Sequence, residues 1–214
     1  MYHTNHPLIL ASASPRRKEL LEQLGITLIV VPAHIAEVQQ SHESGLAMVQ
    51  RLAREKARAV AKMYPSDFIL SADTDVELDG VALGKPKDSA EAEQIVNKLA
   101  GRTHSVHTVA CLLCTEKNIE EVVSSETRVT FRKLTSQEIT AYVRSDHVLD
   151  KAGAYGAQGI GLSIIERVEG SFSGVVGLDL ALTLDILLRH SVIHVDNLSC
   201  TDDVRDSEAH ALKR

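Results

Sequence analysis

The stretch Leu8–Gly25, LILASASPRRKELLEQLG, constrains the fold more than any other part of this chain. Leu8–Ala11 is a short apolar run that is typical of a buried strand. Ser14 followed by Pro15 is typical of the cap and the first residue of a helix, and Gly25 is typical of a helix end. We therefore expect a strand, a tight polar turn and a helix in direct succession.

Three basic residues depart from the usual pattern at the start of this helix. Arg16, Arg17 and Lys18 lie in its first turn, where the helix dipole and the free backbone N–H groups are already positive. A polyphosphate would remove the conflict, because N–H groups, the hydroxyls of Ser12 and Ser14 and two guanidinium groups would converge on one anion. A solvated basic helix end that binds nothing is the alternative that the residues alone leave open.

A strand followed by S-x-S-P-R-R and a leucine-rich helix resembles the Maf family of nucleotide pyrophosphatases. The resemblance covers almost all of residues 8–188, and its motifs follow the order of the family. The further motifs are Arg54–Ala57, Ala72–Thr74, Leu83–Pro86, Gly101–His104, Lys151–Gly159 and Val176–Leu178. The resemblance implies an α/β fold with a mixed twisted sheet, flanking helices and two lobes around a central cleft, related to inosine triphosphate pyrophosphatases.

The resemblance also implies a reaction and a set of site residues. A nucleoside triphosphate would be hydrolysed between its α- and β-phosphates, which yields a monophosphate and pyrophosphate. The charge of the triphosphate would be neutralised by four cations: Arg16, Arg17, Lys56 and Lys85. Glu37 and Asp73 would bind a divalent cation, and Asp73 is also the candidate general base. Since these ligands offer only oxygen, Mg²⁺ or Mn²⁺ is the expected cofactor.

Three positions make the chain similar to one substrate subgroup of that family. The subgroup that acts on dTTP and UTP has arginine, threonine and glutamine there, as in Arg16, Thr74 and Gln158. The subgroup that acts on 7-methylguanosine triphosphate has tryptophan, glutamine and glutamate. A glutamine amide both donates and accepts hydrogen bonds, which matches the O4 and N3–H edge of uracil or thymine. We expect dTTP and UTP as the best substrates, with 7-methylguanosine triphosphate or another modified nucleotide as the alternative.

Hydrophobic periodicity predicts the elements that carry these residues. Ser44–Tyr64 has an apolar stripe at helical spacing, and Lys56 lies on it, so its ammonium group either extends to solvent or points into a cleft. The family resemblance favours the cleft. Phe68–Ala72 is predicted as a buried strand with Asp73 just beyond its carboxyl end. We expect Asp75 to face solvent, and a second metal carboxylate is the alternative.

The remaining pattern predicts more strands and helices and one folded domain. Residues 1–190 form this domain, and the polar residues 191–214 are expected to form a disordered tail. The other strands are predicted at Ile26–Val31, Val76–Leu78, Val81–Leu83, Ser105–Thr115, Val122–Leu134 and Ser163–Val168. The other helices are predicted at Asp88–Leu99, at residues 135–143 and at Val175–His190.

Composition narrows the functional classes. The 214 residues are 44% hydrophobic, so the chain can bury a proper core, and the net charge of −6 argues against general nucleic-acid binding. The sequence shows no apolar run that would span a membrane and no signal-peptide pattern. Its three cysteines cannot pair completely, so we expect a cytoplasmic protein. Its expected partner is the nucleotide, and the sequence leaves a homodimer open.

Two further classes stay open at this point. Cys111 and Cys114 form a C-x-x-C pattern, which would suit a redox protein. The pattern lies inside a predicted strand, however, where residues three apart face opposite sides. Two ordinary core thiols are therefore the expected state. A nucleotide-binding regulator without catalysis is the other class, although a full set of cleft residues argues against it.

Overall fold

The computed structural model describes residues 1–41, 43–145 and 147–196. In this part of the chain a mixed sheet of seven strands lies at the centre of the molecule. Its strands are β2 (Leu8–Leu10), β3 (Ile29–Val30), β4 (Phe68–Leu78), β5 (Val81–Ala82), β6 (Thr103–Cys114), β7 (Ile119–Phe131) and β8 (Ile165–Glu169). The order across the sheet is β3-β2-β4-β6-β7-β8, and β5 pairs with the end of β4.

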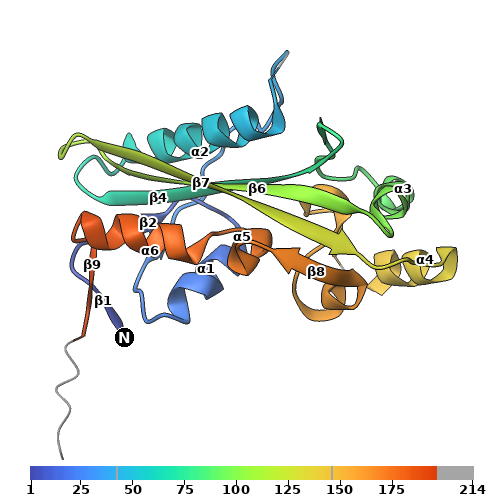
Figure 1. Cartoon of the computed structure of the whole chain (residues 1–214). Helices are drawn as coiled ribbons and strands as arrows, with labels where there is room; N and C mark the ends of the chain where they lie inside the picture. Colours follow the sequence, from blue (N-terminus) through green and yellow to red (C-terminus); the bar gives the residue numbers. More distant parts are fainter. Residues whose placement is uncertain (42, 146, 197–214) are drawn as a thin grey trace, which may run out of the picture.

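The centre of this sheet consists of two long antiparallel strand pairs, β4 with β6 and β6 with β7 (Figure 1). On the other side of β4, β2 and then β3 run parallel. The pairing of β4 with β6 continues from Ile69 to Glu77 without a break. The prediction that the strand ends at Ala72 is therefore wrong, and Asp73 lies in the middle of β4. Pairing with β6 extends a strand whose polar residues interrupt its apolar run.

Helices cover both faces of the sheet. α2 (Gly45–Ala61) lies on one face, whereas α1 (Pro15–Glu22), α5 (Phe172–Val176) and α6 (Leu180–Arg189) lie on the other (Figure 1). At one end of the sheet lie α3 (Ser89–Leu99), α4 (Ser136–Ser145) and two short 3-10 helices, η1 (Ala152–Ala154) and η2 (Gly159–Ile164). This arrangement confirms the predicted α/β class with a mixed sheet and flanking helices.

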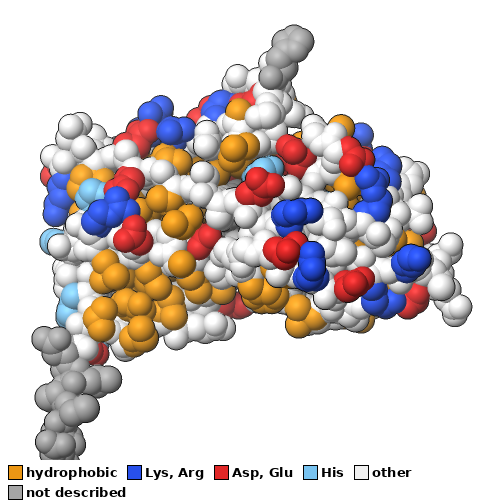
Figure 2. Space-filling view, viewed as in Figure 1, with side chains coloured by type: hydrophobic (Ala, Val, Ile, Leu, Met, Phe, Trp, Pro, Cys, Tyr) orange, Lys and Arg blue, Asp and Glu red, His pale blue; other side chains and the backbone are white. Residues whose placement is uncertain are grey.

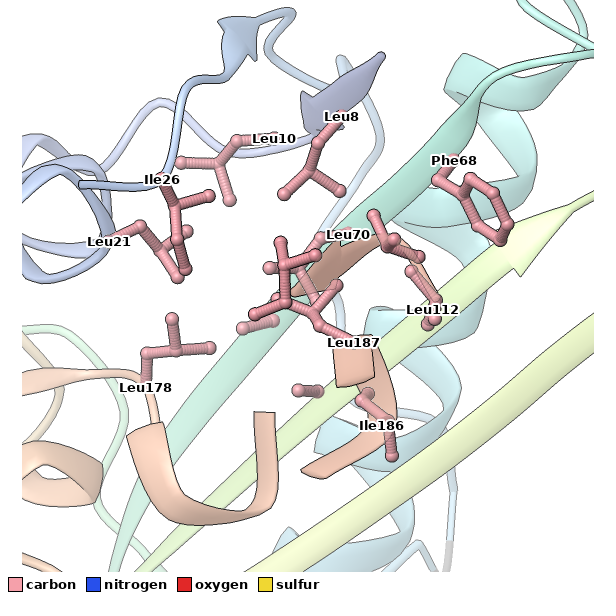
Figure 3. Close-up of a cluster of buried hydrophobic side chains, with 14 of the residues drawn as sticks. Leu8, Leu10, Leu21, Ile26, Phe68, Leu70, Leu112, Leu178, Ile186 and Leu187 are labelled. Carbon is pink, nitrogen blue, oxygen red and sulfur yellow. The ribbon is translucent and has the colours of Figure 1, made fainter. Parts of the chain in front are cut away.

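Alternate residues of the central strands supply two different cores. Leu8 and Leu70 point to the face that carries α6 and meet Ile186 and Leu187 (Figure 3). Their neighbours in sequence, among them Ile9, point to α2. Because each fully buried aliphatic side chain contributes about 1.5–3 kcal/mol, this alternation fixes the register of the strands. A third cluster, around Phe131 and Tyr155, lies at the α3 and α4 end.

The predicted helix Val175–His190 is interrupted. Gly177 follows α5 with a φ of +132°, a conformation that side-chain-bearing residues rarely adopt. Asp179 then caps α6 by accepting a hydrogen bond from the Leu182 N–H at 3.2 Å. The apolar pattern runs through both helices, so periodicity alone does not reveal the break. Its consequence is that the Gly177 carbonyl faces Arg17 of α1.

The folded domain continues past the predicted boundary at residue 190. β9 (Ile193–Val195) pairs antiparallel with β1 (Tyr2–Thr4), and Val192 and Ile193 are buried in the core below α6. The boundary is therefore wrong for residues 191–196, since their strand partner comes from the opposite end of the sequence. The rest of the predicted tail, residues 197–214, lies outside the described residues.

The two cysteines of the C-x-x-C pattern are free thiols buried on opposite faces of β6. Burial raises the pKa of Cys111 to about 12, so the reactive thiolate is disfavoured. The expectation of core thiols is confirmed, and the geometry gives the redox alternative no support.

The surface seen in Figure 2 carries two kinds of region. Charged side chains lie mainly along the top and over the right half of the view, and an apolar patch lies at the lower left, near α6. Among the described residues, no helix is long and apolar enough to cross a membrane.

Candidate active site

One cleft of about 550 Å³ brings most of the predicted site residues together. Its walls come from the amino end of α1, from α2, from the middle of β4 and from residues 150–157. The predicted residues that line it are Ser12, Ser14, Arg16, Arg17, Glu37, Lys56, Asp73, Thr74 and Lys85. Gln158 is exposed at the start of η2 and is not among the lining residues, although Gly156 and Ala157 are. Its role in base recognition stays a prediction.

The amino end of α1 opens into this cleft. Ser14 occupies the N-cap position, as predicted, but its side chain makes no capping hydrogen bond. The Ser12 hydroxyl accepts a hydrogen bond from the Ser14 N–H at 3.2 Å. The first turn thus has no side-chain cap, which suits an anionic ligand at this helix end. Arg16 lies beside it and pairs with Asp150 at 3.2 Å.

Arg17 is held by neutral oxygens. Its Nε donates to the Gly177 carbonyl at 2.8 Å, and its two Nη atoms donate to Ser12 Oγ at 3.1 Å and Thr74 Oγ1 at 3.2 Å. Burial lowers the pKa of Arg17, and this effect is opposed by the field of Asp73. Within the described part of the chain, no carboxylate oxygen lies within 4.0 Å of its guanidinium group. Its positive charge therefore faces the cleft without a paired anion.

Lys56 and Lys85 are held in the opposite way, by carboxylates. Lys56 is only 6% exposed, which confirms that its side chain points into the cleft. Its Nζ lies 2.6 Å from Asp73 Oδ1 and 2.5 Å from Glu37 Oε1, and Lys85 Nζ lies 2.9 Å from Glu37 Oε2. Burial raises the pKa of Glu37, but the hydrogen bonds from both lysines outweigh it and lower the pKa to about 2. Glu37 is thus a carboxylate shared by two ammonium groups.

Asp75 lies behind this group and not in solvent. It is 2% exposed, it is one of the residues that line the cleft, and burial raises its pKa to about 6. The prediction of a solvent-facing side chain is wrong because the start of α2 covers this part of β4. Gly45 makes the approach possible, since a Cβ atom there would lie 2.8 Å from Asp75 Oδ2. Two-residue spacing from Asp73 is the sequence signal for this shared face.

Sequence reasoning missed the part of the cleft that Tyr155 and Val106 line, which we call its apolar end. Tyr155 lines it, and its hydroxyl lies 2.7 Å from Nε2 of His104. The Tyr155 ring packs edge-on against Phe131, with ring centroids 4.7 Å apart. Burial lowers the pKa of His104 to about 4, so this histidine is neutral at physiological pH. Both residues lie in motifs of the resemblance, but nothing in the sequence pairs one motif with the other.

Comparison with known proteins identifies the family of the chain. The family model described as Maf-like protein matches residues 7–190. The chain belongs to the Maf family. It is 45% identical over 195 residues to a dTTP/UTP pyrophosphatase of Desulfotalea psychrophila, covering 91% of this chain and all of that relative. A protein of the same name from Myxococcus xanthus is 49% identical, with 85% and 91% of the two chains covered.

Two further comparisons place the family and the fold. The dTTP/UTP pyrophosphatase of Escherichia coli is 46% identical, with 87% of this chain and 94% of that relative covered. Among solved structures, the Staphylococcus aureus Ham1 protein has a TM-score of 0.51 at 14% identity, with 86% of this chain and 99% of that chain covered. This last likeness shows the fold alone. The family model and the three relatives together confirm the predicted membership of the Maf family.

Proposed function

We propose that this protein hydrolyses dTTP and UTP to the nucleoside monophosphate and pyrophosphate. The observation that supports the reaction most directly is the cleft, which is lined by Arg17, Lys56 and Lys85 and by the uncapped amino end of α1. Such a set of donors suits a triphosphate and neutralises the charge that develops on its phosphates. The names of the relatives support the choice of dTTP and UTP.

A divalent cation belongs to this proposal. Among the described residues there is no group of three or more His, Cys, Asp or Glu side chains arranged to hold a metal. Glu37 and Asp73 nevertheless place a carboxylate oxygen each on the same Lys56 ammonium group, so both point to one place in the cleft. One or two carboxylates, completed by substrate phosphates and water, are the usual protein ligands of Mg²⁺. The residues therefore suit Mg²⁺ or Mn²⁺, which would add positive charge at the phosphates.

The chain's own groups divide the remaining work. Arg17 and the N–H groups of α1 bind and orient the phosphates, and Lys56 and Lys85 stabilise the charge of the pyrophosphate leaving group. Asp73 is proposed to take the proton of the attacking water, once the phosphates draw Lys56 away from it. The apolar end of the cleft, with Tyr155 and Val106, would exclude water from the sugar and base. Base recognition by Gln158 remains part of the proposal.

A substrate comparison tests this function. Release of monophosphate and pyrophosphate would be measured for dTTP, UTP and 7-methylguanosine triphosphate, with Mg²⁺, with Mn²⁺ and with excess EDTA. We expect the highest kcat/KM for dTTP and UTP, and loss of turnover in EDTA. A preference for 7-methylguanosine triphosphate would overturn the substrate class, and full activity in EDTA would overturn the cofactor. Nucleotide binding without turnover would favour a regulator.

We also propose that the protein acts in the cytoplasm. Cys111 and Cys114 are free thiols, which is the state that a reducing compartment maintains.

A further inference from the structure

We propose that Thr108 is a positioning residue for triphosphate binding and that it acts through Thr74 on Arg17. The inference rests on the proposed function, because it concerns the residue that would hold the phosphates. Thr108 lies on β6, directly opposite Thr74 on β4, and is 2% exposed. It does not line the cleft, so any influence on the ligand has to pass through its neighbours.

The hydrogen bonds between these residues have a defined direction. Thr108 Oγ1 donates to the Gly174 carbonyl at 2.8 Å and lies 3.3 Å from Thr74 Oγ1. A hydroxyl has one proton, so while Thr108 donates to Gly174 its oxygen can only accept from Thr74. The Thr74 proton is shared between Thr108 Oγ1 and the Gly177 carbonyl, which lies 3.4 Å from Thr74 Oγ1. The Thr74 oxygen then keeps its lone pairs for the Arg17 Nη2 donor at 3.2 Å. The Gly177 carbonyl fixes the same guanidinium group through Nε at 2.8 Å.

This network holds Arg17 without neutralising it. A guanidinium group has five N–H donors, and the described contacts to Gly177, Ser12 and Thr74 use three of them. Two donors and a full positive charge remain for an anion. The other cations that line the cleft have carboxylate partners: Arg16, Lys56, Lys85 and Lys151. The orientation of the side chain therefore matters most at Arg17, because a planar guanidinium group has to face the phosphate to donate two parallel hydrogen bonds.

The network also gives Thr74 a specific part. Its hydroxyl contacts Arg17, Thr108 and, at 3.4 Å, the Gly177 carbonyl. These partners belong to the phosphate end of the cleft. We therefore infer that the Thr74 side chain affects phosphate binding through its contact with Arg17.

The test compares three substitutions on β6. Thr108→Val removes the hydroxyl and keeps the shape, whereas Thr108→Ser keeps the hydroxyl and removes a methyl group. Thr103→Val is the matched control, because Thr103 on the same strand makes a threonine pair with Thr130 at 2.8 Å away from the cleft. For each purified protein we would measure kcat and KM for dTTP, the dissociation constant of inorganic pyrophosphate, inhibition by thymidine, and the melting temperature.

We expect Thr108→Val to raise KM and the pyrophosphate dissociation constant together, by about tenfold, with kcat changed less than about twofold. Inhibition by thymidine, which has no phosphate, should not change. Thr108→Ser and Thr103→Val should behave like the unmodified protein. Unchanged pyrophosphate binding in Thr108→Val, or an equal loss in Thr108→Ser, would overturn the positioning role. If Thr108→Val does not fold, Thr74→Val breaks the same chain and should weaken pyrophosphate binding without affecting thymidine.

The two proposals fail in different ways. If the unmodified protein does not turn over dTTP, the proposed function is wrong, but pyrophosphate binding still reports on Arg17. If it turns over dTTP and Thr108→Val equals Thr103→Val in every measurement, only the positioning role is wrong.

Discussion

The two walls of the cleft hold their cations by different means. In the lysine wall, formed by Lys56, Lys85, Asp73 and Glu37, every ammonium group has a carboxylate partner. In the arginine wall, formed by Arg17 and its oxygen partners Ser12, Thr74 and Gly177, the cation has neutral partners only. A polyphosphate has to displace carboxylates from the lysine wall, whereas it adds to the arginine wall without displacing an anion.

The two walls would bind a phosphate in different ways. The arginine wall attracts the anion directly, whereas the lysine wall exchanges a bound carboxylate for it. Removing a charged group from water costs several kcal/mol unless a partner compensates it. The lysine wall compensates this cost internally and is stable without a ligand. The arginine wall leaves part of the cost in place, which a bound phosphate would offset. We therefore expect the arginine wall to determine phosphate affinity, and the lysine wall to couple phosphate binding to the carboxylates that turnover requires.

Asp73→Asn should give the largest effect and tests the lysine wall. The change is nearly isosteric, but it removes the charge that a water molecule or a metal needs and breaks the ion pair with Lys56. We expect kcat for dTTP to fall about a hundredfold or more. Circular dichroism and the melting temperature would check that the protein is folded. Near-normal turnover in a folded Asp73→Asn protein would remove Asp73 from the proposed mechanism.

Arg17→Lys should give the next largest effect and tests the arginine wall. A lysine cannot reproduce the fork that bonds Ser12, Thr74 and Gly177 and still presents donors to a phosphate. We expect the dissociation constant of pyrophosphate to rise about thirtyfold. Arg16→Lys is the matched change, and because Arg16 already pairs with Asp150, it should have an effect of about threefold or less. Equal effects at the two positions would contradict the division into walls.

His104→Gln tests whether the apolar end of the cleft behaves differently from both walls. The folded-state pKa of His104 is about 4, below the ordinary value of 6.5, because burial disfavours the charged ring. The unfolded chain therefore binds the proton first as the pH falls. The contribution of neutral His104 to the unfolding free energy is fully present above pH 6.5 and is lost as the pH falls toward 4.

Denaturant titrations at pH 7.5 and pH 4.5 would measure this effect. The unmodified protein should lose about 2 kcal/mol more of its unfolding free energy between these two values than the His104→Gln protein. Glutamine keeps a group that can hydrogen-bond Tyr155, so the two proteins should differ little at pH 7.5. An equal pH dependence in both proteins would show that His104 is not buried in the neutral form.

The sequence predicted the residues of both walls better than it predicted their backbone. Arg17, Lys56 and Lys85 lie in short motifs whose chemistry is visible residue by residue, and the structure brings them into one cleft. The continuation of β4 through Asp73 depends on pairing with β6, more than thirty residues later in the chain. Periodicity within one segment carries no information on such a partner. The burial of Asp75 has the same origin, because the start of α2 supplies its cover.

The break at Gly177 and the added strand β9 show the same limit. A glycine inside an apolar helical pattern is compatible with either a continuous or an interrupted helix. Its role becomes visible only when its carbonyl is seen to accept a hydrogen bond from Arg17. Likewise, Ile193–Val195 is too short to predict as a strand without β1 beside it. Local chemistry was therefore predictable, and the contacts between distant segments were not.

Glu37→Gln should give the smallest effect and sharpens the comparison most. Pyrophosphate binding should tighten if Glu37 competes with phosphate for the two lysines, and weaken if Glu37 only positions them. Glu37 holds the ammonium groups of Lys56 and Lys85 at 2.5 and 2.9 Å, and its low pKa of about 2 keeps it ionised at neutral pH. Without metal, pyrophosphate has to displace this carboxylate. Neutral glutamine competes less well for both lysines. We therefore expect pyrophosphate to bind about fivefold tighter in EDTA, although turnover with Mg²⁺ falls.

Glu55→Gln is the matched control for this last measurement. It changes the net charge by the same amount on α2, but Glu55 pairs with Arg51 outside the cleft. If both substitutions tighten pyrophosphate binding equally, the cause is the overall charge and not the release of two lysines. If Glu37→Gln weakens binding in EDTA, the carboxylate helps to position the lysines and does not occupy the place of a phosphate. Tighter binding in Glu37→Gln alone would mean that this carboxylate competes with phosphate for the lysine wall, whereas Arg17 has no such competitor.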